Sequence, residues 1–499
     1  MKRNIRIVIA MLILAMMLPT VLACAQTETP DTTTAPAATE APSGADATTV
    51  PEDTLFAPSE IPDDLRFDGT TVNFLYWDDV PNVEFFVEDQ TGESVNDAIY
   101  KRNAKIQEQF GVTLDFVGTP GNYNKQGDFV NACVNSTQSG ADAYDLFSGY
   151  TMTGATLMTL GVTQDLTDYD IMEFDKPWWP KSLISKATVN GGIYFASGDI
   201  STNFIHMMYL TIFNKDMLMD IHHMGADELY DLAYDGKWTL DKLIELSDGV
   251  FLEQSGDNIA SEGDRFGVVV TSVHFDAFYA GSDLNTVVVN GDGNLELSPD
   301  LFSQKTVDLL EKLCNLLHVS GNAYIQKSEP LFAAGQALFL VDRPYIITRS
   351  LTDTDFSFGI LPIPKYDEDQ ADYRTCLGFG YSMYMLSTAA PDPEAAAATL
   401  ELMAYQSYLN VTPALFEESM KTRYADQSDD AFMFDKIRDG VDIDVARLFT
   451  IQLDKMSYSI FRNAVNGNTA GSYMSSQKAH ERALDMKIAA INETLKGLQ

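Results

Sequence analysis

The chain contains 499 residues, of which 45% are hydrophobic, and its 33 Lys and Arg against 72 Asp and Glu give a formal net charge of −39. A surface this negative repels phosphate backbones, so we expect no nucleic-acid partner. At about 100–200 residues per domain, the length is sufficient for two lobes.

The N-terminal residues have a pattern typical of a secretory signal peptide. Basic residues precede an unbroken apolar run at 7–18, which is too short to span a membrane. The tetrapeptide Val-Leu-Ala-Cys at 21–24 resembles the lipobox of bacterial lipoproteins, in which the cysteine is diacylated and becomes the new N-terminus. We therefore expect a signal peptide over 1–23 and a lipid on Cys24 that anchors the protein to the outer face of the bacterial cell membrane. The alternative is an ordinary signal peptide in which Cys24 is incidental.

A linker follows the cysteine. Residues 25–54 include nine Thr, seven Ala and four Pro, and Val50 is their only larger aliphatic side chain. Such a segment cannot bury enough apolar surface to offset its ordering entropy, so disorder is expected. The prediction is a lipid-anchored linker over 24–65 and a globular body after it. No later run is apolar enough to cross a membrane.

The remaining cysteines are Cys133, Cys314 and Cys376, an odd number that allows at most one disulfide. We favour none, because Cys133 and Cys314 lie in apolar, helix-like patterns. No Cys/His cluster has metal-ligand spacing, so neither a metal nor a cofactor is expected. The Asn-Gly-Asp-Gly run at 290–293 indicates a hairpin turn and lacks the spacing of a calcium-binding loop.

The first part of the body alternates strands with helices. Such a βαβαβ order predicts a parallel sheet with right-handed crossovers. Ligands in such sheets bind beyond the carboxyl ends of the strands, and Trp77, Asp78 and Tyr150 stand at two such ends. The expected strands are 71–77, 112–117 and 144–148, and the expected helices are 95–110 and 127–137.

Further elements are expected along the rest of the chain. Residues 207–213 form a β-branched and aromatic run, typical of a strand. A helix is expected to begin near Trp238, with Thr239 as its N-cap. Later helices are expected at 393–405 and 473–495.

A series of short motifs in this part of the chain resembles the extracellular solute-binding proteins of carbohydrate-type ABC importers. The resemblance covers nearly all of the body, in the right order, and implies a type II periplasmic-binding-protein-like α/β fold. Two discontinuous lobes would be joined by a hinge and close on a solute. The motifs are at 213–218, 229–232, 236–243, 331–339, 359–364 and 378–381.

The same resemblance implies how the lobes are divided. Residues 66–203 and 336–376 would form the N-terminal lobe, and residues 204–335 and 377–499 the C-terminal lobe. The expected partners are a carbohydrate and the permease subunits of an ABC transporter, and the protein is expected to be a monomer.

A sugar site needs aromatic faces for stacking and fixed polar groups for the hydroxyls. For Trp178 and Trp179, packing at the edge of a lobe is an equal alternative. For Asp199 and Arg343, the alternative is an intramolecular salt bridge or a cap. The resemblance implies that Tyr150 and Tyr345 line the cleft, and for these two and Trp77 the alternative is packing in the core. The candidate substrate-binding residues are Trp77, Asp78, Tyr150, Trp178, Trp179, Asp199, Arg343, Tyr345, Phe379 and Tyr381.

Three functions compete. The first is a lipid-anchored, non-catalytic binding protein that delivers a sugar or oligosaccharide to an ABC permease, with a peptide or polyamine as an alternative solute. The second is a lipid-anchored glycoside hydrolase, which needs two carboxylates at a defined separation, and no such pair can be identified among 72 acidic residues. The third is a surface adhesin, which repeats or all-β patterning would indicate, and neither is present.

Overall fold

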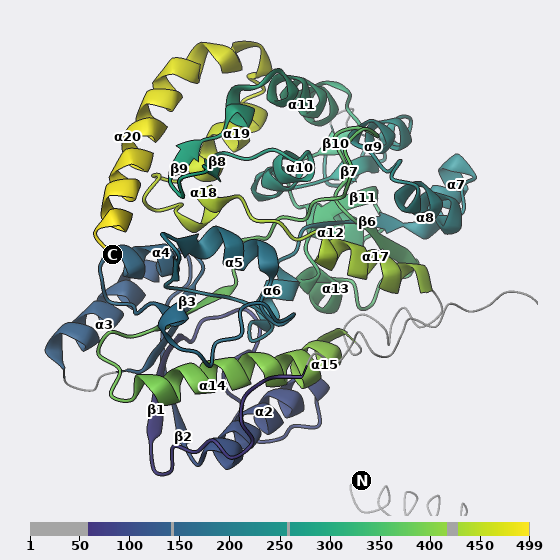
Figure 1. Cartoon of the computed structure of the whole chain (residues 1–499). Helices are drawn as coiled ribbons and strands as arrows, with labels where there is room; N and C mark the ends of the chain where they lie inside the picture. Colours follow the sequence, from purple (N-terminus) through teal and green to yellow (C-terminus); the bar gives the residue numbers. More distant parts are fainter. Residues whose placement is uncertain (1–57, 141–143, 257–259, 417–427, 499) are drawn as a thin grey trace, which may run out of the picture. The chain divides into compact units, whose positions relative to one another are not determined.

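The structure is a computed structural model (Figure 1) that describes residues 58–140, 144–256, 260–416 and 428–498. They belong to a compact unit, Ala57–Gln499. The predicted signal peptide, the lipidation of Cys24 and most of the predicted linker lie outside the described residues. Within those residues, no helix has the length and apolarity needed to cross a bilayer.

The first sheet contains the predicted βαβαβ unit. Strand β1 pairs in parallel with β2 on one side and with β3 on the other, and β13 joins β3 antiparallel. Helices α3 and α4 pack against β3, and α14 packs against β1 and β13. The strands are β1 (Thr71–Trp77), β2 (Thr113–Thr119), β3 (Leu146–Tyr150) and β13 (Ser382–Leu386), and the helices are α2 (Ser94–Phe110), α3 (Gln126–Ser139), α4 (Thr153–Thr159) and α14 (Pro393–Gln406).

Local sequence accounts for the ends of α2. The Glu93 side chain accepts a hydrogen bond from the backbone N–H of Asn96 and so caps the first turn. Gly111 ends the helix with φ +69°, in the left-handed region that favours glycine. The helix therefore begins one residue before the predicted start and ends at the predicted residue.

The second sheet has five strands in the order β10-β7-β11-β6-β12. Strand β6 is antiparallel to both β11 and β12, whereas β7 is parallel to β11 and β10. Strands β6 and β11 are buried along their whole length, as expected for a sheet covered on both faces. The strands are β6 (Leu210–Asn214), β7 (Phe266–Val269), β10 (Ala323–Tyr324), β11 (Ala337–Asp342) and β12 (Phe358–Leu361).

Helices and short strands surround this second sheet (Figure 1). Thr239 caps α9 as predicted, and the 290–293 turn joins β8 to β9 as a hairpin. The helices near the sheet are α7 (Lys215–His222), α8 (Ala226–Tyr234), α9 (Leu240–Ser247), α10 (Phe275–Gly281), α11 (Gln304–Cys314), α12 (Ser328–Ala333) and α13 (Tyr345–Ser350). The other elements are α5 (Lys181–Ala187), β4 (Thr188–Val189), β5 (Gly192–Ile193), α6 (Thr202–His206), β8 (Val287–Val289), β9 (Leu295–Leu297), α15 (Thr412–Phe416), α17 (Ser428–Asp439), α18 (Val445–Leu448), α19 (Met456–Asn466) and α20 (Gln477–Lys496).

The strand pairing corrects the predicted division of the chain between the lobes. Strands β11 and β12 lie within 336–376, which was assigned to the N-terminal lobe, but they pair in the second sheet. Strand β13 lies within 377–499, which was assigned to the C-terminal lobe, but it pairs in the first sheet. The physical reason is that an apolar run predicts a strand without specifying its partner, because pairing depends on hydrogen bonds to segments far away in the sequence.

Two connecting segments run between the sheets side by side. Ala196 bridges Tyr384, and Met208 bridges Leu377, both antiparallel. The chain therefore leaves the first sheet along 196–208 and returns to it along 377–384, beside the outgoing segment. This pair of segments brings residues of both sheets together at the site described next.

The three remaining cysteines, Cys133, Cys314 and Cys376, are buried and unbonded. Burial raises the pKa of all three thiols. Each behaves as a small apolar side chain, in line with the preferred interpretation of the sequence.

Candidate functional site

A cavity of about 790 Å³ lies at the carboxyl ends of strands from both sheets. Tyr150 is the last residue of β3, and Arg343 directly follows β11. Met207 and Gly380 line the same cavity from the two connecting segments. The volume falls within the range of about 300–1,000 Å³ typical of small-molecule sites, and the position is the one that α/β sheets use for ligands.

Aromatic side chains form much of the cavity wall. They come from both sheets and from the C-terminal helices, so their proximity is a product of the tertiary fold. Burial raises the pKa of Tyr150 and Tyr209, so both hydroxyls stay protonated. The Tyr209 hydroxyl donates to the carbonyl of Val273 at 3.1 Å, and the Tyr150 hydroxyl can donate to a ligand. The aromatic lining residues are Tyr123, Tyr150, Tyr209, Tyr345, Phe379 and Tyr458.

Arg343 is positioned by neighbours on its own segment. Its Nε donates to Asp342 at 3.3 Å, and its guanidinium group lies 4.8 Å from the centre of the Tyr345 ring. One terminal nitrogen, Nη2, approaches Nε2 of His274 at 3.3 Å and the Tyr345 hydroxyl at 3.4 Å. Burial and the positive charge of Arg343 hold the pKa of His274 well below its usual range, so the imidazole is neutral. The side chain of Arg343 is 18% exposed.

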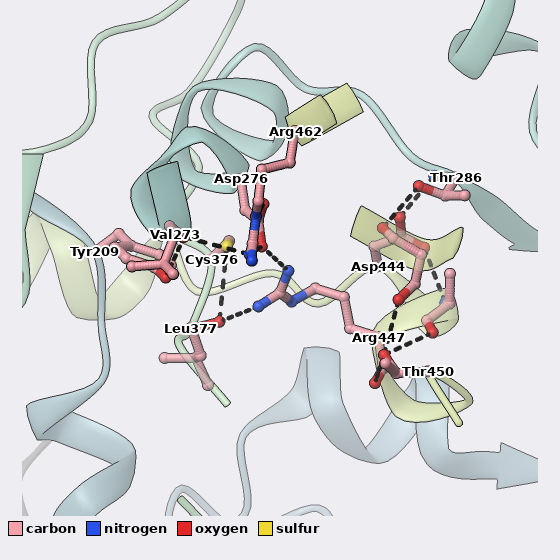
Figure 2. Close-up of polar contacts among 12 residues, drawn as sticks. Tyr209, Val273, Asp276, Thr286, Cys376, Leu377, Asp444, Arg447, Thr450 and Arg462 are labelled. Atoms are coloured by element: carbon pink, nitrogen blue, oxygen red, sulfur yellow. Dashed lines mark hydrogen bonds and ion pairs between the residues drawn. The ribbon is translucent and has the colours of Figure 1, made fainter. Parts of the chain in front are cut away.

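A second charged cluster lies beside this wall (Figure 2). Asp276 on α10 accepts from Nη1 of Arg447 at 2.9 Å and from Nη2 of Arg462 at 2.6 Å. Arg447 is buried, donates to the carbonyl of Leu377 at 2.7 Å, and lies 4.0 Å from the centre of the Phe379 ring. Arg462 on α19 lines the cavity, 4.2 Å from the centre of the Tyr458 ring.

Four of the predicted site residues come together in the cavity. They are Tyr150, Arg343, Tyr345 and Phe379. Arg343 combines the two interpretations that the sequence left open, because it is both paired with Asp342 and exposed to the cavity. Contact between these four residues and a ligand remains a prediction.

Trp178 and Trp179 are fully buried and lie outside the cavity lining. Their indole nitrogens donate to the two carboxylate oxygens of Glu401, at 2.5 and 3.0 Å. The structure thus favours packing, one of the two alternatives that the sequence left at even odds.

Two further aromatic candidates stand behind the cavity wall. Trp77 is buried, donates from Nε1 to the Ser382 hydroxyl at 2.7 Å, and meets Tyr150 edge to face with ring centres 5.5 Å apart. Tyr381 is 3% exposed and packs edge to face against Phe204. Both residues support the wall in this conformation and do not form its surface.

The two predicted carboxylates also lie outside the lining. Asp78 is exposed at the end of β1. Asp199 is buried on the outgoing connecting segment, where it accepts from the Thr412 hydroxyl at 2.9 Å and pairs with Arg438 at 3.3 Å. The salt bridge offered as the alternative for Asp199 is therefore present.

The residue-level prediction missed several lining residues, namely Asn82, Tyr123, Met207, Tyr209, Arg349, Tyr458 and Arg462. Tyr458 and Arg462 stand four residues apart and therefore share one face of a helix, a spacing visible in the sequence. Nothing in the sequence indicates that this face meets β3 and β11. Within the described residues, no cluster of three or more His, Cys, Asp or Glu could hold a metal ion.

Comparison with protein-family models gives no match, and comparison with curated protein sequences gives none either. Solved structures do match. The ABC substrate-binding protein Lmo0181 from Listeria monocytogenes, in complex with cycloalternan, is 15% identical; the match covers 86% of this chain and 100% of that chain, with a TM-score of 0.52.

Two more solved structures match over a similar extent. The maltose/maltodextrin-binding domain MalE from Bdellovibrio bacteriovorus, bound to maltotriose, is 13% identical over 84% of this chain and 100% of that one, with a TM-score of 0.51. UgpB from Mycobacterium tuberculosis, in complex with glycerophosphocholine, is 15% identical over 84% of this chain and 99% of that one, with a TM-score of 0.55. The predicted fold class is confirmed: the chain has the α/β fold of the type II ABC substrate-binding proteins.

Proposed function

We propose that this protein captures a carbohydrate in the cavity and delivers it to the permease of an ABC transporter. The observation that carries the proposal is the cavity at the carboxyl ends of β3 and β11, which aromatic rings and hydrogen-bond donors line together. Aromatic faces suit the C–H faces of a sugar ring, and fixed donors suit its hydroxyls. Two proteins of the same fold, from Listeria monocytogenes and Bdellovibrio bacteriovorus, were solved with cycloalternan and maltotriose.

The proposal is one of binding without catalysis. A glycoside hydrolase needs two carboxyl groups that face the sugar, and the described residues that line this cavity include no Asp or Glu. The same lining disfavours a polyamine, because it contains three arginines and no described carboxylate that could pair with a cationic ligand.

The proposed location is the outer face of the cell membrane, through a lipid on Cys24. The lipobox-like tetrapeptide at 21–24 and the Thr- and Ala-rich run after it support this part of the proposal. Anchored in this way, the binding protein would remain close to its permease.

The test is a thermal-shift screen of the purified protein against oligosaccharides, peptides and polyamines. A ligand that binds only the folded state raises Tm by mass action. At a free ligand concentration of one hundred times Kd, it adds about 2.7 kcal/mol to the free energy of unfolding. We expect an oligosaccharide to raise Tm and to be recovered intact after incubation. A rise with a peptide or polyamine and none with any oligosaccharide would contradict the proposal, as would release of shorter sugars.

A further inference from the structure

The cavity carries a charge opposite to that of the chain. The formal net charge is −39, yet three arginines, Arg343, Arg349 and Arg462, line the cavity, and the described lining includes no carboxylate. Resting on the proposed function, we propose that the captured solute is an acidic oligosaccharide whose anionic group is held by these guanidinium groups. A uronic-acid carboxylate and a sulfate ester share the required chemistry, which is a planar or clustered set of anionic oxygens.

The ion pairs behind the wall leave positive charge uncompensated. One carboxylate, that of Asp276, is shared by Arg447 and Arg462, both within 2.9 Å. Two guanidinium groups that share one carboxylate leave a net charge of +1, beside the part of the cavity wall that Arg462 forms. An anionic ligand would supply the missing charge in a partly desolvated position, where electrostatic attraction is stronger than in water.

Arg343 keeps one end of its guanidinium group weakly bonded. Asp342 accepts a hydrogen bond from Nε, and His274 and Tyr345 lie beside Nη2. The partner of Nη1 among the described residues is the sulfur atom of Met207, at 3.6 Å. A thioether is a weak acceptor. A Cβ atom at Gly378 would lie 3.2 Å from Nη1, so glycine at this position leaves the space open.

Arg343 and Arg462 reach the same short segment from different elements. Nη2 of Arg343 lies 3.3 Å from Nε2 of His274, and Nη2 of Arg462 donates to the carbonyl of Val273 at 3.4 Å. The proposal places the anionic group of the ligand between these two guanidinium groups. Arg349, exposed on α13, adds a third positive charge to the lining, and it forms no ion pair within the described residues.

The alternative is that these arginines only hold the elements together and that the ligand is neutral. Holding the elements together does not account for Arg349, which is exposed at the cavity, and the 2:1 ratio at Asp276 leaves positive charge beside the lining. The cations also lie against the aromatic wall, because Arg343 faces Tyr345 and Arg462 faces Tyr458.

The experiment is calorimetric titration of the full mature chain with matched pairs of trisaccharides. Trisaccharides of glucuronate, galacturonate and mannuronate are each compared with the carboxyl-reduced form, which has CH2OH in place of every carboxylate. A sulfated trisaccharide and its desulfated form make a second arm, so that the two sources of anionic charge are distinguished. We expect an acidic member of at least one pair to bind about ten-fold or more tightly than its neutral partner, the scale of one hydrogen bond to a charged group.

The variants test where this preference arises. Arg349→Gln and Arg462→Gln should each reduce the preference for the acidic member about ten-fold, with a smaller effect on the neutral member. Arg482→Gln removes the same charge from an exposed position on α20, outside the cavity lining, and should leave the preference unchanged. Raising NaCl from 50 to 500 mM should weaken binding of the acidic member more than that of the neutral one.

The possible failures can be distinguished. Neutral members that bind as tightly as or more tightly than their acidic partners would overturn the acidic-ligand inference and leave the proposed function standing. Binding of neither form of any trisaccharide would overturn the acidic-ligand inference, and the thermal-shift screen decides on the proposed function separately. An acidic preference that survives in Arg349→Gln and Arg462→Gln alike would also overturn the assignment to these guanidinium groups.

Discussion

Tyr345 differs from the core aromatics in what its side chain contacts. It begins α13 after Pro344, is partly buried, and has the Arg343 guanidinium 4.8 Å from its ring centre. Proline fixes its own φ and so restrains the backbone that carries the ring. A residue held in this way at a cavity wall can contribute to binding without being essential to the fold.

We predict that Tyr345→Ala weakens carbohydrate binding by about 1–3 kcal/mol, the scale of an aromatic binding anchor, with little change in the Tm of the ligand-free protein. Truncation of a core aromatic would instead cost about 3–5 kcal/mol of stability. Calorimetry for Kd and thermal unfolding for Tm, on the same variant, separate the two. Tyr345→Phe is the matched control, because it keeps the ring and removes only the hydroxyl beside Arg343. A large loss of Tm with unchanged affinity would place Tyr345 in the core.

Glu401 provides the hydrogen-bond acceptors for the buried indole N–H groups of Trp178 and Trp179. Three N–H donors, from the two indoles and from the backbone of Glu173, point at its oxygens. Burial raises the pKa of Glu401 to about 7, and these three donors oppose that shift. The ordinary pKa of a glutamate is 4.5, so the folded protein binds the proton more tightly than an exposed glutamate does.

The consequence is a pH dependence with a definite sign. A raised folded-state pKa contributes stability that is present below about pH 4.5 and is lost as the pH rises through about 7. We predict that the stability of the wild type relative to Glu401→Gln falls between pH 5 and pH 8, by at most about 3 kcal/mol. Thermal unfolding of both proteins across this range measures the difference. Glu394→Gln, at an exposed position on the same helix, is the control. If the stability difference between the wild type and Glu401→Gln stays constant or grows with pH, the hydrogen-bond donors outweigh burial in setting the pKa of Glu401.

At the scale of elements, the paired connecting segments decide where the cavity forms. The bridges from Ala196 to Tyr384 and from Met208 to Leu377 hold the outgoing and returning segments together. Asp199 adds a tie from the outgoing segment to Thr412 on α15 and to Arg438 on α17. These contacts join elements that are distant in sequence, and they lie outside the cavity lining.

We predict that Asp199→Asn lowers the free energy of unfolding by about 1–2 kcal/mol, because the charge-assisted contact with Arg438 is lost while the Thr412 hydroxyl keeps an acceptor. Carbohydrate affinity should change less than two-fold. Arg438→Gln should reproduce the loss, and the double variant should be less destabilised than the sum of the two, since they remove one interaction. A ten-fold loss of affinity at normal Tm would instead return Asp199 to the ligand site.

At the scale of the whole molecule, the proposed anchor can be tested independently of the cavity. One acyl chain binds a membrane weakly, whereas the two or three chains of a lipoprotein hold it stably. We predict that Cys24→Ala moves the protein from the membrane fraction to the medium. Cys314→Ala, which changes a buried thiol in the folded body, is the control and should leave the distribution unchanged. Continued membrane association of Cys24→Ala would contradict the anchor.

The sequence by itself determined the local structure of this protein and its fold class. Alternating β-branched and aromatic runs predicted β1, β2, β3 and β6 within a few residues, because side-chain periodicity and turn residues act over short distances. The ordered series of family-like motifs predicted the two-sheet fold that the solved structures share. Four of the candidate residues, among them Tyr345, line the cavity, and their contact with a ligand stays a prediction.

Only the tertiary structure decided which sheet each strand joins and which side chains meet. Strands β11 and β13 have the same apolar character in sequence, yet they pair in different sheets, because pairing is set by hydrogen bonds to distant partners. Trp178 and Tyr345 are both aromatic, but one packs on Glu401 and the other faces a cavity. The convergence of Arg343 with Arg462 depends on contacts that span 69 residues to His274 and 189 residues to Val273, and no local pattern encodes such contacts.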